Sequence, residues 1–326
     1  MESDKDIVEL GKKNGEVFVL VEPTVFWASE QTLKDNAYMV DFDMTKEETT
    51  AAAIEEHHEL VKKLTDAGIA TKVFKQPHPE AYDAVYASDT MLCFKNEDFP
   101  TGVCVICPMY WQSRRLEKNP EISKWIKEQC GYEHIIDLTY FEAEDKALEG
   151  RGTTLFDWKS RCVYAGRSNR VHPDVLHELA KRMTEISGKQ YEGYLIETFD
   201  PVRKEVPFHT TCFFMILRDL VIIDWTSVKL ECQQKEMKEK LTKSGYEIIE
   251  VSYEEMNYGA TLIVEFNNIK TGGLGLICAK SAKEKLSKRV WDIYNEKFSP
   301  IIIVDIEINE IVGGSSVECM FQPVAL

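Results

Sequence analysis

The sequence predicts an α/β protein built as a closed ring of five similar modules. Short runs rich in β-branched and aromatic residues alternate with amphipathic helical stretches along the chain. The order strand, strand, helix, strand recurs in blocks that begin near positions 84, 147, 208 and 260, a repeat of about 50–60 residues. A fifth block forms only if the C-terminal strand at 317–324 joins the N-terminal strand and helix, which would also remove exposed sheet edges.

The elements follow from local patterns. Apolar, β-branched runs predict strands at 17–23, 84–94, 102–109, 162–168, 212–217, 220–225, 246–251, 261–266, 274–280 and 300–308. Helical apolar periodicity predicts helices near 47–67, 119–130, 172–188, 231–244 and 281–297. The last helix has a start signal, because Ser281 is a suitable N-cap and Glu284 follows three residues later.

Polar residues recur at the repeat distance in the first strand of each module. Asp89, Glu149 and His209 are spaced 60 and 60 residues apart. Ala260 follows after 51 residues, and Cys319 after a further 59. If equivalent strand positions point at the ring axis, an Asp, a Glu, a His and a Cys converge there. The repeat therefore predicts an active site in a central cavity.

Cys319 is the candidate nucleophile and His209 its candidate acid/base. Each has a simpler interpretation, since a cysteine or histidine in an apolar strand is often a buried packing residue. The flexible run 313–316 before Cys319, and the matching repeat position of His209, favour catalysis. The histidine can supply the base or positive charge that a thiol needs to react near neutral pH. No metal-ligand spacing is present among the histidines. We expect neither a metal nor an organic cofactor, because the thiolate would do the nucleophilic work.

Asp89 and Glu149 suggest the chemistry of the substrate. Both lie in apolar surroundings, where a carboxylate is costly unless it is paired or hydrogen-bonded. A guanidinium offers five donors in a planar fork that matches carboxylates. Two such acids beside a Cys/His pair therefore indicate a substrate whose guanidino carbon is presented to the thiolate.

The chain resembles the superfamily of guanidino-group modifying enzymes: arginine deiminases, dimethylarginine hydrolases, arginine:glycine amidinotransferases and a citrulline-hydrolase branch. The segments that carry the resemblance, in family order, are DAVYASDT (83–90), PMYWQSRR (108–115), LEGRGTTL (148–155), YAGRSNR (164–170), FHTTCF (208–213) and GGSSVECM (313–320). The resemblance extends from about Phe18 to the C-terminus and implies a pentein-like fold, a five-bladed α/β propeller of ββαβ modules. We expect one catalytic domain over residues 1–326, with the first ~15 residues as a flexible extension.

The resemblance implies a role for each catalytic candidate. Cys319 would attack the guanidino carbon and form a covalent thiouronium intermediate. His209 would protonate the leaving amine and then activate water. Glu149 and Asp89 would hold the guanidinium nitrogens.

The resemblance also implies contacts to the amino-acid end of the substrate. Arg114 or Arg115, together with Arg170, would hold the α-carboxylate, and Asp83 would contact the α-amino group. For the arginines, the alternative is ordinary surface charge.

Departures from the family pattern bear on the substrate. Deiminases and amidinotransferases usually carry an acid two residues after the histidine, where this chain has Thr211. The segment 149–152 reads Glu-Gly-Arg-Gly, as in the citrulline-hydrolase branch, whereas Asp89 suits a cationic guanidinium better. An amide often found in the fourth module is replaced by Ala260. The expected substrates are, in order, a methylated arginine, citrulline and arginine.

Two other functions stay open. An amidinotransferase would pass the amidino group to an amine instead of water. A catalytically silent propeller would act as a binding protein, because a fold does not fix a function.

Composition and charge restrict the partners and the cellular location that we expect. The formal charge of −16 argues against nucleic acid and anionic membranes as partners. The first 13 residues lack the apolar core of a signal peptide, which predicts a cytoplasmic protein. We expect most of the nine cysteines to be buried thiols. The sequence leaves open whether the chain forms a homodimer.

Overall fold

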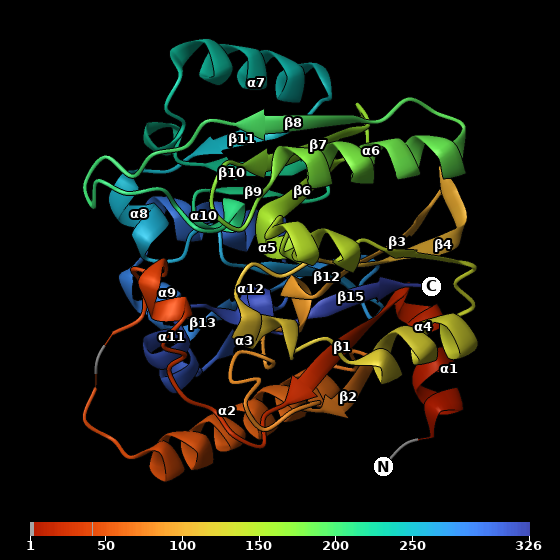
Figure 1. Ribbon diagram of the computed structural model, residues 1–326, viewed down its shortest axis with the longest axis vertical. Helices are drawn as coiled ribbons and strands as arrows, with labels where there is room; N and C mark the ends of the chain where they lie inside the picture. Colours follow the sequence, from red (N-terminus) through yellow and green to blue (C-terminus); the bar gives the residue numbers. More distant parts are fainter. Residues whose placement is uncertain (1–2, 41) are drawn as a thin grey trace.

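Five three-stranded sheets stand around a common centre in the computed structural model, which describes residues 3–40 and 42–326 (Figure 1). Each sheet pairs its first two strands antiparallel and its last two parallel, with a helical connection before the third strand. The first strands lie innermost, where β15 contacts β3 and β6 contacts β9. The structure is therefore the predicted five-bladed α/β propeller of ββαβ modules.

The sheets and their main helices are as follows. The first blade contains β15 (Gln322–Ala325), β1 (Glu16–Glu22), α2 (Lys46–Asp66) and β2 (Thr71–Lys75). The second contains β3 (Met91–Asn96), β4 (Phe99–Ile106), α4 (Pro120–Cys130) and β5 (His134–Asp137). The third contains β6 (Thr154–Asp157), β7 (Cys162–Gly166), α6 (Pro173–Ser187) and β8 (Glu192–Ile196). The fourth contains β9 (Phe214–Ile216), β10 (Leu220–Ile223), α7 (Glu231–Lys243) and β11 (Glu247–Glu250). The fifth contains β12 (Val264–Asn268), β13 (Gly273–Ala279), α9 (Lys280–Lys285), α10 (Lys288–Lys297) and β14 (Ile301–Val304).

Shorter helical elements complete the chain. They are α1 (Asp4–Asn14), η1 (Thr32–Lys34), η2 (Ala87–Asp89), α3 (Gln112–Arg115), η3 (Thr139–Glu144), α5 (Gly150–Thr153), η4 (Thr210–Cys212), η5 (Trp225–Ser227), α8 (Tyr253–Asn257), α11 (Glu307–Gly313) and α12 (Val317–Met320). Four of these, η2, α5, η4 and α12, directly precede the inner strands β3, β6, β9 and β15. They pack on one another near the centre of the ring, while α2, α4, α6 and α7 lie at its periphery (Figure 1).

The two chain ends close the ring. β15 pairs antiparallel with β1, in register from Glu16 opposite Ala325 to Val19 opposite Gln322. Strand β1 is apolar and almost wholly buried because it is the central strand of its sheet, with β2 parallel on its other side. The predicted pairing of the N-terminal and C-terminal strands is confirmed.

Buried apolar side chains fill the spaces between neighbouring blades and their helices. One cluster joins the fourth and fifth blades through Phe214, Ile222, Leu276 and Tyr294. A second joins the fifth and first blades through residues such as Phe18. Each blade is thus stabilised by its neighbours, as expected when a small sheet cannot bury its faces alone.

The predicted strands at 84–94 and 317–324 begin later than expected. Residues 84–89 form consecutive turns, with Tyr86 N donating to Asp83 O and Asp89 N to Tyr86 O, so β3 starts only at Met91. In the same way, α12 replaces the first part of the C-terminal strand. The predicted strand at 300–308 likewise ends at Val304, before α11.

The predicted helix at 281–297 is two helices. Leu286 adopts an extended backbone with φ −66° and ψ 146°, which ends α9. Ser287 then caps α10 by accepting a hydrogen bond from Val290 N. Ser281 lies inside α9, whose N-cap is Ala279, so the predicted cap at Ser281 is wrong.

The N-terminal segment forms the helix α1, which packs on the first two blades. Ser3 caps α1 in a capping box with Asp6, and Ile7 and Val8 are buried. The helix contacts β1, β2 and α4. Residues 4–14 therefore form a packed helix, whereas the flexibility expected of the first ~15 residues stays a prediction.

The prediction that most cysteines are buried agrees with the structure. All nine cysteines are free, and seven of them are buried, as expected for reduced thiols. In the part of the chain that the structure describes, no helix is both long and apolar enough to cross a bilayer.

Candidate active site

The structure brings the four predicted catalytic side chains together at the N-terminal ends of the inner strands. Asp89 is the last residue of η2, Glu149 and His209 are the N-caps of α5 and η4, and Cys319 lies in α12. An Asp89 oxygen, a His209 ring nitrogen and Cys319 Sγ lie within 4.8 Å of one another. His209 Nε2 lies 3.2 Å from Glu149 Oε2. All four side chains are buried.

A cavity of about 360 Å³ leads to this cluster. His209 and Cys319 line it, together with Tyr38, Phe208 and Met256. Its walls are mixed polar and apolar, and its volume suits a single small molecule. The cavity therefore presents the sulfur and the imidazole to a compound of amino-acid size.

The two predicted guanidinium-binding acids already hold a guanidinium, that of Arg114. Its Nη1 lies 2.7 Å from Glu149 Oε2, and its Nη2 lies 3.0 Å from Asp89 Oδ2. Glu117, which follows one turn later, accepts two further bonds of 2.9 and 3.0 Å. The Arg114 side chain is only 2% exposed, so a buried positive charge balances a group of buried carboxylates.

Arg170 forms a second buried ion pair beside the first. Its guanidinium contacts both oxygens of Asp35 at 2.6 and 3.0 Å and lies 3.3 Å from Glu149 Oε2. The face of the guanidinium lies 4.5 Å from the Phe208 ring centroid, a cation–π geometry. Arg170 thus lies beside the cavity rather than on the outer surface.

The remaining predicted substrate contacts differ in position. Asp83 is buried, accepts a hydrogen bond from Thr32 Oγ1, and leaves Oδ1 without a hydrogen-bond partner. Arg115 is partly exposed and donates to backbone oxygens of Met109 and Tyr110. The structure therefore places Arg114, and not Arg115, against the site carboxylates.

Burial and neighbouring charges set the protonation of the site. Burial alone would raise the pKa of Glu149, but the guanidinium groups of Arg114 and Arg170 hold that pKa well below its ordinary value. Burial, followed by the carboxylates of Asp89 and Glu318, raises the pKa of the Cys319 thiol well above its ordinary value. In these surroundings the Cys319 side chain is therefore a neutral thiol.

Gly152 allows the close packing of the site. A Cβ atom at this position would lie 2.5 Å from His209 Nδ1 and 2.8 Å from Asp89 Oδ1. Helix α5 can therefore approach η2 and η4 only because this residue has no side chain.

Three atoms of the site could also hold a metal ion. The Asp89 oxygen, the His209 nitrogen and Cys319 Sγ are close enough to bind one ion, and this donor set suits Zn²⁺. Cys319 Sγ and the His209 nitrogen would then be bound to the ion and unavailable for other chemistry.

Three acidic residues of the site were not singled out from the sequence. Glu117 and Glu318 lie close in sequence to Arg114 and Cys319, which is a local signal that could have pointed to them. Asp35 has no such signal, since it lies in a loop 135 residues before its partner Arg170.

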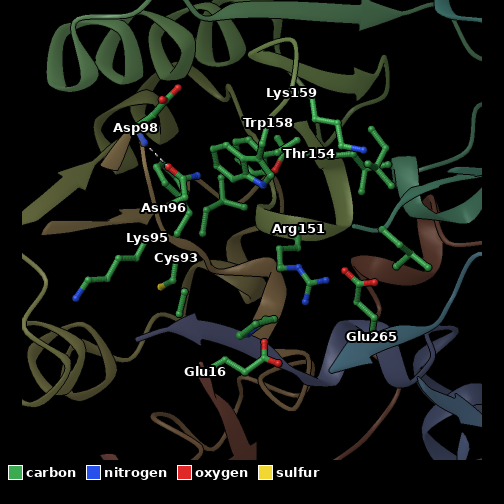
Figure 2. Close-up of a pocket in the computed structure, with 18 of the residues that line it drawn as sticks. Glu16, Cys93, Lys95, Asn96, Asp98, Arg151, Thr154, Trp158, Lys159 and Glu265 are labelled. Carbon is green, nitrogen blue, oxygen red and sulfur yellow. Dashed lines mark hydrogen bonds between the residues drawn. The ribbon is translucent and has the colours of Figure 1, made fainter. Parts of the chain in front are cut away.

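A second, larger cavity of about 550 Å³ lies further along the inner strands, toward their C-terminal ends (Figure 2). Glu16, Arg151, Trp158 and Glu265 are among the residues that line it. Figure 2 shows the Arg151 guanidinium pointing into this space, toward the Glu265 carboxylate.

The propeller, with a Cys/His pair and guanidinium-binding acids at its centre, is that of the guanidino-group modifying superfamily. A sequence profile of the family described as "N,N dimethylarginine dimethylhydrolase, eukaryotic" matches residues 22–326. The chain therefore belongs to the N,N-dimethylarginine dimethylhydrolase family. No curated protein sequence matches it.

Solved structures share the fold at low sequence identity. The N-terminal domain of ArgZ, an arginine dihydrolase from cyanobacteria crystallised with its substrate, has a TM-score of 0.71 and 17% identity and covers 95% of this chain and 98% of that domain. Unliganded AgrE has a TM-score of 0.71 and 16% identity, covering 95% of this chain and 39% of its own. The dimethylarginine hydrolase of Pseudomonas aeruginosa, crystallised with citrulline, has a TM-score of 0.63 and 15% identity over 94% of this chain and 98% of its own.

Proposed function

We propose that the protein hydrolyses a C–N bond at the guanidino carbon of a methylated arginine, through a covalent intermediate on Cys319. One observation carries the proposal: Asp89 and Glu149 hold a guanidinium group within the same cluster as Cys319 Sγ and the His209 ring. Membership of the dimethylarginine hydrolase family supports the substrate class. Citrulline and arginine are the next candidates.

Substrate binding would exchange one guanidinium for another. The substrate's guanidinium would take the place of the Arg114 side chain between Asp89 and Glu149. Arg114, released from these acids, would then contact the α-carboxylate of the substrate, together with Arg170. The unpartnered Asp83 Oδ1 suits the α-amino group.

The first half of the reaction replaces a C–N bond by a C–S bond. The thiolate of Cys319 attacks the guanidino carbon and gives a neutral tetrahedral adduct. His209, protonated and held by Glu149, donates its proton to the methylated nitrogen, which leaves as the amine. A positively charged thiouronium remains on the sulfur.

The second half uses water. His209, now neutral, accepts a proton from a water molecule as its oxygen bonds to the carbon. Collapse of this adduct breaks the C–S bond and leaves a ureido product, whose extra proton passes to the released amine. The site residues are restored to their starting state.

A cationic substrate would itself favour the thiolate. Burial, and then the Asp89 and Glu318 carboxylates, raise the pKa of Cys319. A guanidinium bound beside the sulfur opposes this effect, because an opposite charge within about 4–6 Å favours the ionised form. A neutral ureido compound lacks this advantage, which is why methylated arginine is placed before citrulline.

A substrate panel tests the proposal. Arginine, monomethylarginine, dimethylarginine and citrulline are incubated with the wild type, with Cys319→Ser and with Cys232→Ser, a control at the exposed cysteine. Mass spectrometry identifies citrulline, ornithine, ammonia and methylamines. We expect methylamine and citrulline from a methylated arginine in the wild type and the control, and none in Cys319→Ser.

The other outcomes separate the alternative functions. Transfer of the amidino group to an added amine, with little hydrolysis, would indicate an amidinotransferase. If no compound is turned over and iodoacetamide labels Cys319 no faster than the other cysteines, the enzymatic proposal is wrong and a binding protein is left.

A further inference from the structure

An acidic side chain contacts the proposed nucleophile directly. Glu318 precedes Cys319 in α12, and the Glu318 side chain is fully buried. Cys319 Sγ lies 3.3 Å from Glu318 Oε2, a hydrogen-bond distance for a thiol donor. Burying a carboxylate in this position costs free energy unless a positive charge or hydrogen bonds compensate it.

Arg151 provides the compensating charge for Glu318. Its Nη2 lies 3.6 Å from Glu318 Oε1, which has no hydrogen-bond partner. The side chain extends from α5 into the second cavity (Figure 2) and is 24% exposed there. Arg151 lines that cavity with Glu16 and Glu265, so its positive charge acts on these two carboxylates as well as on Glu318.

We propose that Glu318 is a catalytic residue that accepts the Cys319 thiol proton, and that Arg151 positions it. This inference rests on the proposed function, in which Cys319 is the nucleophile. As the sulfur attacks, its S–H bond breaks, an O–H bond forms on Glu318 Oε2, and a sulfur electron pair forms the C–S bond. When the C–S bond breaks at the end of the cycle, the proton returns to the sulfur.

The position of His209 explains why a second proton acceptor is needed. His209 Nε2 lies 3.2 Å from Glu149 Oε2, and the ring must carry a proton to release the amine. An imidazolium has no free lone pair, so it cannot also accept the thiol proton. Glu318 meets this need, leaving His209 as acid and base for the amine and the water.

The surroundings of Glu318 suit a proton acceptor. The charged or titratable groups that influence it are Arg151, Asp89, Cys319 and His209. Burial raises the pKa of Glu318 above its ordinary value, while Arg151 lowers it. With Oε2 3.3 Å from the sulfur and the Arg151 guanidinium near Oε1, the Glu318 carboxylate is placed to take up the thiol proton.

The variant Glu318→Gln distinguishes two roles of Glu318: accepting the thiol proton, or only raising the Cys319 pKa by its charge. The substitution keeps the shape and removes a negative charge that raises the Cys319 pKa. We expect iodoacetamide to label Cys319 at pH 7.5 at least as fast as in the wild type, while kcat/KM for methylated arginine falls about 100-fold or more. If kcat/KM is unchanged, or rises together with the labelling rate, Glu318 is not the proton acceptor.

Arg151 variants provide an independent test that does not depend on the folding of Glu318→Gln. Arg151→Gln should raise the Glu318 pKa and move the acidic limb of the kcat/KM profile upward by about 0.5–1 pH unit, and Arg151→Lys should move it less. An acidic limb that stays in place in both variants would overturn the positioning role. Loss of activity in Glu318→Gln with full activity in Cys319→Ser would instead refute the proposed function.

Discussion

Arg114 lies where a substrate guanidinium would meet Asp89 and Glu149. Substrate affinity should therefore depend on how readily this side chain leaves the two acids and what it binds afterwards. Its fork also contacts both oxygens of Glu117, at 2.9 and 3.0 Å, so the same residue links binding to the stability of the site.

Arg114→Lys should weaken substrate binding more than it slows chemistry. Lysine keeps the charge but loses the fork that fits a carboxylate, so KM should rise about 10–100-fold, with a smaller change in kcat. The melting temperature should also fall, because Glu117 loses its bidentate partner. Steady-state kinetics and thermal denaturation check both effects.

Arg115→Lys is the matched control, since Arg115 contacts backbone oxygens and Asp145 instead of the site acids. We expect its KM within about twofold of the wild type, as for a partly exposed contact. Equal increases in KM for the two variants would contradict the role given to Arg114.

At the residue scale, repeat spacing located the central cluster well. Equivalent positions before the inner strands meet at the axis, so the spacing of Asp89, Glu149, His209 and Cys319 was sufficient to predict their convergence. The same spacing could not predict that the Arg114 guanidinium binds Asp89 and Glu149, because this contact depends on the conformation of the Arg114 side chain. Nor could it indicate Asp35, which reaches Arg170 from a distant loop.

At the element scale, the site depends on the short helical turns η2, α5, η4 and α12. The sequence predicted continuous strands where η2 and α12 occur, because apolar residues around Asp89 and Cys319 look the same in a buried turn as in a buried strand. The turns bend the backbone so that polar side chains face the axis before each inner strand begins. Predicted strand starts were therefore wrong where the site is built.

The close contact of α5 with η2 and η4 allows a prediction about substitution of Gly152. Gly152→Ala would place a methyl group 2.5 Å from His209 Nδ1 and 2.8 Å from Asp89 Oδ1, so the His209 ring or α5 must shift. A displacement of about 1 Å at a catalytic group can cost about 100-fold in rate, and we expect kcat to fall by at least that factor. Kinetics at saturating substrate measures the effect.

Gly273→Ala is a suitable control for this substitution. A Cβ atom there would only touch Thr271 Oγ1 at 3.5 Å, an ordinary contact. Activity should be unchanged. Full activity in Gly152→Ala would show that the close approach does not constrain the catalytic groups.

At the scale of the whole molecule, the chain ends close the ring at a seam that includes a partly buried acid. Glu16, the first residue of β1, accepts hydrogen bonds from the backbone and side chain of Asn267 in β12. The closure itself was predictable, because unpaired edge strands are avoided and only the chain ends could complete the fifth module. The charge within the seam was not predictable, since it depends on which side chains meet there.

Glu16 should make stability depend on pH. Burial raises its pKa from 4.5 to about 7, so the folded protein keeps a proton that the unfolded chain loses above about pH 4.5. Glu16 therefore costs no stability below the unfolded pKa, and its cost grows as the pH rises from about 4.5 to about 7. Glu16→Gln removes this cost and can still accept the hydrogen bonds from Asn267.

We expect Glu16→Gln to be about 2 kcal/mol more stable than the wild type at pH 8, and about equally stable at pH 4.5. Urea denaturation at the two pH values measures the difference, with Glu128→Gln, at an exposed position of α4, as control. A stability difference that is the same at both pH values would mean that Glu16 keeps its ordinary titration in the folded ring. Protonation of Glu16 would then make no contribution to the stability of the ring closure.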